Sequence, residues 1–279
     1  MSMISFPGVP AVSMTTFDLS QTATRTLDTA TDTALQWSAS ASTHFSFTGI
    51  GLQPVVVGGQ LTDITGGTFT GFSSVYSGVT VALITDWSVS AARFFDIYAT
   101  HGWPRLMDFV LSGKDHVAGT SGGDTLTGGA KNDVVLGNDG ADIAGGGTGN
   151  DRVEGGAGSD TLTGGQGLDV LVGGAAADEF RFDLTPLHNS VDTIRDFHHL
   201  VDHIAIDHLD FLNVGGQGAL DATHFTLGTM ATTAAQGILY DRATGSIYVD
   251  QDGVGGADAV LFATVTAGLN LTAADFLVI

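Results

Sequence analysis

One apolar side chain recurs at every ninth position between residues 113 and 182. The recurring residues are Val117, Leu126, Val135, Ala144, Val153, Leu162, Leu171 and Phe180. A fixed period of this length is typical of stacked repeats in which each unit contributes to one shared interior. Because side chains alternate across a strand, we predict a six-residue turn and a three-residue strand in each unit, with the middle strand residue pointing inward.

The apolar pattern before the repeat is less regular. Short strand-like runs, such as residues 44–47 and 68–75, are separated by glycines and predict a mostly β structure. Apolar spacing over residues 88–100 predicts a short helix, and Pro104 suits the first turn of another that ends near Leu111. We therefore expect one or two helices next to the start of the repeat.

The pattern after the repeat changes to longer alternating runs. Residues 238–240, 246–250 and 259–265 are separated by turn-like segments and predict an antiparallel meander. A chain of 279 residues also exceeds the usual size of one domain. We therefore expect an all-β chain of three parts, which are a cap region of unknown function (1–112), a repeat that forms a roll (113–183) and a β module (184–279).

The charge of the chain excludes several classes of partner. Nine basic and 30 acidic residues give a net charge of -21, which repels nucleic acid and anionic membranes and attracts cations. Forty glycines and no cysteine mean that something other than disulfides must stabilise the glycine-rich part. We find neither the basic and apolar pattern of a Sec-type signal peptide nor a stretch long enough to span a bilayer.

An aspartate lies two positions before each recurring apolar residue. These aspartates are Asp115, Asp124, Asp133, Asp142, Asp151, Asp160, Asp169 and Asp178. Ca²⁺ takes six to eight oxygen ligands, and a turn that combines a carboxylate with inward carbonyls supplies several of them. Most units place a glycine two residues before the aspartate, where a left-handed backbone is expected, but Lys131 and Ala176 occupy that place in two units. Solvated turn aspartates would not require strict register over eight copies.

The repeat closely resembles the RTX family, whose nonapeptide GGxGxDxUx, with U a large apolar residue, forms a calcium-bound parallel β-roll. The resemblance implies that two nonapeptides make one coil and that each ion lies between neighbouring loops of one edge. One edge would then carry Asp115, Asp133, Asp151 and Asp169, and the other Asp124, Asp142, Asp160 and Asp178. Backbone carbonyls of the first four loop positions would complete each site. The glycines at these positions are Gly119, Gly122, Gly128, Gly137, Gly140, Gly146, Gly149, Gly155, Gly158, Gly164, Gly167 and Gly173. Eight loops on two edges then imply about six Ca²⁺ ions.

The resemblance extends beyond the repeat. Residues 192–197, 202–207 and 271–279 are similar to the C-terminal module of serralysin-type RTX proteins, which carries an uncleaved signal for type I (ABC-transporter) secretion. The acidic and then apolar residues 275–279 match that signal, although the same tail is equally a terminal strand. The resemblance implies a secreted protein of a Gram-negative bacterium, located outside the cell or at its surface, with the type I machinery as a partner during export.

Two motifs in this chain resemble catalytic or zinc sites. Residues 119–123 match the G-x-S-x-G nucleophile elbow of lipases, but Ser121 lies inside the repeat, where the required strand before it and helix after it are not expected. His199 and His203 have the i, i+4 spacing of a zinc pair, and His198 and His208 lie nearby. Because residues 202–207 alternate like a strand, solvent-exposed histidines are the favoured interpretation.

A third motif, residues 250–258, begins like an EF-hand loop. It lacks the bidentate glutamate at position twelve, so a hairpin turn is favoured, and an additional weak calcium site stays open.

These patterns favour a secreted, non-enzymatic calcium-binding protein that folds on binding calcium after export. The alternative is an enzyme, a hydrolase or a polysaccharide-modifying enzyme, with its site in residues 1–112, where His44 and His101 are the neutral-pH bases.

A third possibility is a carbohydrate-binding or adhesive module, for which extracellular polysaccharide or a cell surface would be the partner. Trp37, Trp87 and Trp103 would serve as stacking platforms, although buried aromatic residues are the simpler interpretation.

Overall fold

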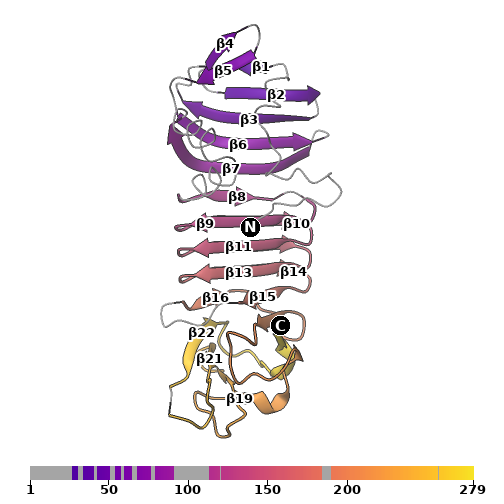
Figure 1. The fold of residues 1–279 in the computed structure, drawn as a ribbon. Coiled ribbons are helices and arrows are strands. Elements are labelled where there is room, and N and C mark those ends of the chain that lie inside the picture. Colours follow the sequence, from indigo (N-terminus) through magenta and orange to yellow (C-terminus); the bar gives the residue numbers. More distant parts are fainter. Residues whose placement is uncertain are drawn as a thin grey trace.

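The computed structural model describes the backbone of seven strands between residues 27 and 90, and residues 113–119, 121–183, 190–256 and 258–279 in full. These segments form an elongated stack of strands, with the roll between an N-terminal and a C-terminal group (Figure 1). Two 3-10 helices, η2 (Ala222–His224) and η3 (Ala273–Asp275), are the helical elements of the described residues, none of which forms a helix able to cross a membrane. The prediction of an all-β chain is confirmed.

The first group of strands precedes the roll. It contains β1 (Leu27–Ala30), β2 (Ala34–Ser40), β3 (Thr43–Ile50), β4 (Pro54–Val57), β5 (Gln60–Ile64), β6 (Thr68–Tyr76) and β7 (Val79–Ser90). Five of them pair antiparallel in the order β1-β2-β3-β6-β7, and β4 pairs with β5 in a separate hairpin. The runs predicted at 44–47 and 68–75 lie in β3 and β6. Strand β7 includes the first three residues of the predicted 88–100 helix, and the rest of both predicted helices lies outside the described residues.

The roll consists of two parallel sheets that share one chain. Its strands are β8 (His116–Ala118), β9 (Thr125–Ala130), β10 (Val134–Asp139), β11 (Ile143–Thr148), β12 (Arg152–Ala157), β13 (Thr161–Gln166), β14 (Val170–Ala175) and β15 (Glu179–Phe182). Even-numbered strands pair in one sheet and odd-numbered strands in the other. Partners are two nonapeptides apart, as Val135 opposite Val153 shows, so two units make one coil.

The eight recurring apolar side chains fill the interior of the roll. They range from 0% to 6% exposed, which confirms the inward position predicted from their spacing. The strands from β9 to β14 span six residues instead of the predicted three, because the glycine pair of the next unit continues the parallel ladder, as Gly147 opposite Gly165 shows. In β11, Ala144 and Gly146 both face inward, and the second inward position of every strand from β9 to β14 is likewise a glycine, which leaves the interior narrow.

The C-terminal group continues the sheets of the roll. Its strands are β16 (Asp192–Ile194), β17 (His203–Ile206), β18 (Gly218–Ala219), β19 (Phe225–Leu227), β20 (Ile238–Asp241), β21 (Ser246–Val249), β22 (Val260–Thr264) and β23 (Phe276–Val278). The predicted meander is present as the antiparallel series β20-β21-β22. However, β16 and β22 extend one sheet in parallel, and β17 and β23 extend the other. Both sheets therefore cross the boundary predicted at residue 183.

A conventional aromatic core lies beneath these strands. Phe262 is in edge-to-face contact with Phe182 and Phe211, at ring-centroid distances of 5.1 and 5.0 Å. Tyr240 is fully buried, and its hydroxyl donates a hydrogen bond to the carbonyl of Leu269 (3.1 Å). Because Phe182 belongs to the last strand of the repeat, the core of the C-terminal group is continuous with the roll.

Candidate metal centre

The eight repeat aspartates form two buried columns, one on each edge of the roll. Each lies directly before a roll strand, and all eight are between 1% and 3% exposed. The backbone N–H of one aspartate donates to Oδ1 of the aspartate one coil later, at 2.7 Å from Asp115 to Asp133 and 2.8 Å from Asp133 to Asp151. The same bond links the other edge from Asp124 to Asp142 (2.7 Å). The columns therefore alternate as the two-nonapeptide coil implies.

The turns that carry these aspartates need left-handed backbone. Gly140, Gly149, Gly158 and Gly167, each two residues before an aspartate, have φ between +124° and +144°. A Cβ at any of these glycines would collide with the backbone of the preceding coil. Lys131 and Ala176 keep the left-handed conformation at φ of 82° and 89°, at the first and the last of these turns. Side chains are therefore accommodated only near the ends of the columns, at a strained φ.

From Asp124 onward, the second oxygen of each repeat carboxylate points toward the first glycine of its loop. Buried carboxylate oxygens without a hydrogen-bond partner are Oδ1 and Oδ2 of Asp115 and Oδ2 of Asp133, Asp142, Asp151, Asp160, Asp169 and Asp178. In these loops the first glycine also lies against the carboxylate. An ideal Cβ at Gly119 would lie 2.7 Å from Oδ2 of Asp124 and 2.5 Å from the carbonyl oxygen of Gly137. Only glycine leaves room there for the carboxylate and the carbonyl of the next coil to converge.

Burial makes seven of these carboxylates costly to ionise. It raises the pKa of Asp133 from 3.8 to about 7, with the neighbouring charges of Asp151 and Asp115 adding to the increase. Burial likewise raises the pKa of Asp115, Asp142, Asp151 and Asp178 to about 6. A column of closely spaced, buried carboxylates is unfavourable unless protons or cations neutralise it.

The donor set fits a hard cation. Unpartnered carboxylate oxygens and backbone carbonyls are the ligands that Ca²⁺ takes in flexible numbers, whereas zinc prefers nitrogen and sulfur. Within the described segments, no three His, Asp or Glu side chains gather as a metal cluster. Each loop pair instead brings two carboxylates together with carbonyls, so the residues present fit calcium.

The sequence of the columns matches a known repeat. The family model of the RTX calcium-binding nonapeptide repeat (4 copies) matches residues 118–153 and 145–180. Residues 118–180 are RTX calcium-binding nonapeptide repeats. A search of the curated proteins found no match. Among solved structures, the chain is similar to the AlgE6R3 subunit of the Azotobacter vinelandii mannuronan C5-epimerase, at 23% identity over 58% of this chain and 76% of that chain, with a TM-score of 0.24.

Two aspartates outside the RTX repeats prolong the columns. Oδ1 of Asp192 accepts the N–H of Asp169, and Oδ1 of Asp202 accepts the N–H of Asp178, both at 3.1 Å. The nine-residue pattern does not include these two aspartates, because they lie 23 and 24 residues after their partners. A signal was present, since each begins an aspartate-x-isoleucine triplet whose isoleucine, Ile194 or Ile204, is buried.

The described structure does not support a nucleophile elbow at residues 119–123 or a zinc site at the histidine cluster. Ser121 is exposed and is followed by β9 instead of the helix that a nucleophile elbow requires. His198 and His203 are exposed, whereas the ring of His199 lies 2.8 Å from Oδ1 of Asp275 and that of His208 lies 2.7 Å from the carbonyl oxygen of Ile279. No zinc site results among these described histidines.

The described residues of the EF-hand-like segment 250–258 lie between β21 and β22. Oδ1 of Asp250 accepts the N–H of Gly253 at 2.8 Å, which closes the turn internally. This arrangement agrees with the hairpin interpretation of the sequence.

The C-terminal tail is part of the described fold. Asp275 is fully buried and accepts the backbone N–H groups of Leu200 (2.8 Å) and Thr272 (2.7 Å). The residues after it form β23, which pairs with β17. The candidate tryptophans have no described side chains, and Trp103 and His101 lie outside the described residues.

Proposed function

We propose that this chain is a secreted, non-enzymatic calcium-binding protein whose roll folds when its aspartate columns bind Ca²⁺ outside the cell. The observation that carries the proposal is the row of buried, unpartnered carboxylate oxygens along both edges. Asp115, Asp133, Asp151 and Asp169 would hold ions on one edge, and Asp124, Asp142, Asp160 and Asp178 on the other. Three gaps between four loops on each edge allow about six ions.

The loop glycines would complete these sites through their carbonyl oxygens. The carbonyl of Gly137 approaches the carboxylate of Asp124 from the next coil, and that of Gly164 approaches Asp151 in the same way. Bound Ca²⁺ supplies positive charge that neutralises the columns. The chain contributes fixed oxygens and a backbone that glycine adopts without strain.

The calculated contribution of the sites is large enough to control folding. If each of about six sites meets Ca²⁺ at roughly ten times its dissociation constant, each adds about 1.4 kcal/mol and together they add about 8 kcal/mol. This total is comparable with the whole stability of an ordinary domain, about 5–15 kcal/mol. The low calcium concentration of a cytosol would therefore leave the columns repulsive and the roll unfolded.

The test is circular dichroism of the full chain in chelator, in millimolar Ca²⁺ and in millimolar Mg²⁺. We expect a strong increase in β signal with Ca²⁺ only, because Mg²⁺ requires a tighter octahedron and loses water reluctantly. Asp151→Asn should weaken the response, and Asp139→Asn, an exposed aspartate of β10, serves as the matched control for charge. A β spectrum that is complete in chelator, or that Mg²⁺ induces equally, would contradict the proposal.

The proposal includes export by a type I transporter. It is supported by the resemblance of residues 275–279 to the signal of serralysin-type proteins. Such a signal must be read before β23 pairs with β17, which agrees with export of an unfolded chain. Deleting residues 275–279 should abolish export by a matching transporter, and unchanged export of that deletion would refute this part.

A further inference from the structure

The two aspartate columns end differently at the C-terminal side of the roll. One ends on Asp192 and the other on Asp202, and both residues are buried at 4% and 1% exposure. Both accept the N–H of the last repeat aspartate of their edge through Oδ1, at the same distance of 3.1 Å. The difference lies in what their second oxygens contact.

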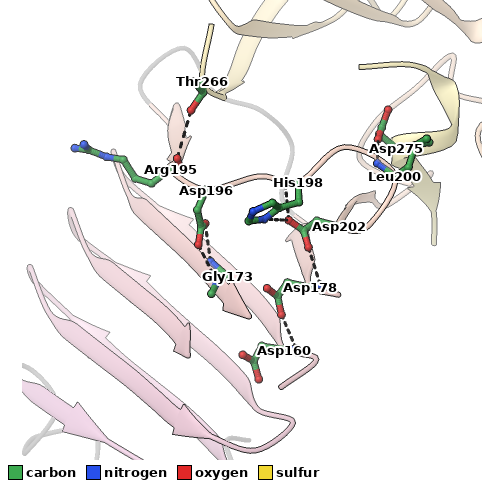
Figure 2. A network of polar contacts seen from close by, with 11 residues as sticks. Asp160, Gly173, Asp178, Arg195, Asp196, His198, Leu200, Asp202, Thr266 and Asp275 are labelled. Atoms are coloured by element: carbon green, nitrogen blue, oxygen red, sulfur yellow. Dashed lines mark hydrogen bonds and ion pairs between the residues drawn. The ribbon is translucent and has the colours of Figure 1, made fainter. Parts of the chain in front are cut away.

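Both carboxylate oxygens of Asp202 accept hydrogen bonds from backbone N–H groups. Its Oδ2 accepts the backbone N–H of His198 at 2.7 Å, and the ring Nδ1 of His198 lies 3.5 Å away (Figure 2). Beside it, the carboxylate of Asp196 accepts the N–H groups of Gly173 and Gly174 at 2.9 and 2.8 Å. The carboxylates of Asp202 and Asp196 are therefore held by backbone donors, whereas Oδ2 of Asp178 on this edge has no hydrogen-bond partner.

Asp192 instead points its second oxygen into the last loop of the other edge. An ideal Cβ at Gly164 would lie 2.6 Å from Oδ2 of Asp192 and 2.6 Å from Oδ2 of Asp169. One coil earlier, the same point at Gly146 faces Oδ2 of Asp151 (2.5 Å) and the carbonyl oxygen of Gly164 (2.7 Å). The carboxylate of Asp192 therefore takes the place that the next coil's glycine carbonyl holds in the preceding loop.

The surroundings of this loop favour a cation. Oδ2 of Asp169 is buried without a hydrogen-bond partner, and Asp169 itself is 1% exposed. A second carboxylate oxygen converges on the same space from Asp192. Two carboxylates in a buried space repel each other unless a proton or a cation lies between them, and oxygen donors of this kind are ligands for Ca²⁺.

We propose that Asp169 and Asp192 bind one further Ca²⁺ ion beyond the nonapeptide array, whereas the other edge ends at Asp202 without an added ion. This inference rests on the proposed function, because it assumes that the repeat loops bind calcium. The array of eight aspartates accounts for six ions, so the full chain should bind seven.

The test is an ion count by native mass spectrometry of the full chain in calcium, together with circular dichroism of each variant. Wild type should hold seven ions and Asp192→Asn six. Asp202→Asn keeps an oxygen for the N–H of Asp178 and should hold seven. Asp139→Asn, the exposed control, should also hold seven.

The outcomes separate this inference from the function it rests on. A wild type with six ions, a folded Asp192→Asn with as many ions as wild type, or an ion lost in Asp202→Asn would each overturn the inference and leave the repeat sites intact. A wild type without bound calcium would overturn the proposed function itself. If Asp192→Asn does not fold, the wild-type count of seven or six still decides.

Discussion

Gly149 is the residue at which a single methyl group tests the stacking of the loops most directly. It lies in the middle of one column, two residues before Asp151, with φ of +133°. An ideal Cβ there would overlap the carbonyl group of Lys131 in the preceding coil. Gly145, in the same coil, offers the matched control. Its φ is not left-handed, and a Cβ there would have its nearest neighbour, the carbonyl oxygen of Thr163, at an ordinary 3.9 Å.

The expected cost of Gly149→Ala follows from these two features. A non-glycine residue in this region of φ costs about 1–3 kcal/mol, and displacing the neighbouring coil adds about 1–3 kcal/mol, for a total near 4 kcal/mol. Together, six sites stabilise the folded state by about 8 kcal/mol for each tenfold rise in the Ca²⁺ concentration above their dissociation constants. The variant should therefore need about threefold more calcium to fold. Gly145→Ala should leave the midpoint unchanged or lower it slightly, since it removes freedom from the unfolded chain and gains about 0.4–1 kcal/mol.

The assay is a calcium titration followed by circular dichroism, with wild type and both variants at the same protein concentration. Equal midpoints for Gly149→Ala and Gly145→Ala would refute the argument, because they would mean that the coils do not approach as closely as the described backbone requires. A large shift for Gly145→Ala alone would refute it as well.

Three further predictions concern the columns. Asp151→Ala should remove two calcium sites and Asp115→Ala one, because Asp151 has a neighbour on both sides and Asp115 on one; equal losses in titration calorimetry would contradict shared sites. Without calcium, the raised pKa values of about 6–7 mean that the folded state binds more protons than the unfolded state. The stability of the fold is therefore present at low pH and lost as pH rises through 6–7. Circular dichroism in calcium-free buffer should show more β structure at pH 5 than at pH 8, and more β structure at pH 8 would contradict this pH dependence. Ala176→Gly should raise the melting temperature in calcium, because it relieves a left-handed φ that costs about 1 kcal/mol. Ala141→Gly, at an exposed loop residue, should lower the melting temperature. A lower melting temperature in both variants would show that Ala176 is unstrained.

The nine-residue register was sufficient to predict much of the roll. Because Asp and the apolar residue two places later recur without a slip, the inward side chains followed from spacing alone. The alternation of the two columns came instead from the resemblance to the RTX family, which implies two nonapeptides in each coil. The strand length did not follow, since the sequence does not tell whether the glycine pair of Gly146 and Gly147 belongs to a turn or continues a ladder. In the structure it continues β11, because Gly147 pairs with Gly165 opposite.

The C-terminal ends of the columns could not be predicted from period. Asp192 and Asp202 reach their places only because β16 and β17 pair with β14 and β15 across intervening segments of irregular length. The aspartate-x-isoleucine triplets were visible in the sequence. A triplet that does not follow the nine-residue spacing is equally compatible with an ordinary turn that leads into a strand. Tertiary pairing, which no local pattern encodes, decides which aspartates join a column.

The same pairing explains how the roll ends. A stack of parallel coils leaves an unpaired strand edge on each sheet, and such edges attract other chains unless they are covered. Here β22 and β23 cover both edges at the C-terminal side, through pairs such as Asp192 with Ala263 and Ile204 with Phe276. These strands come from residues about 70 positions after the strands they pair with. We therefore expect the last coil and its aspartates to reach their final geometry together with residues 260–278, so that binding at the end of the columns is coupled to folding of the C-terminal group.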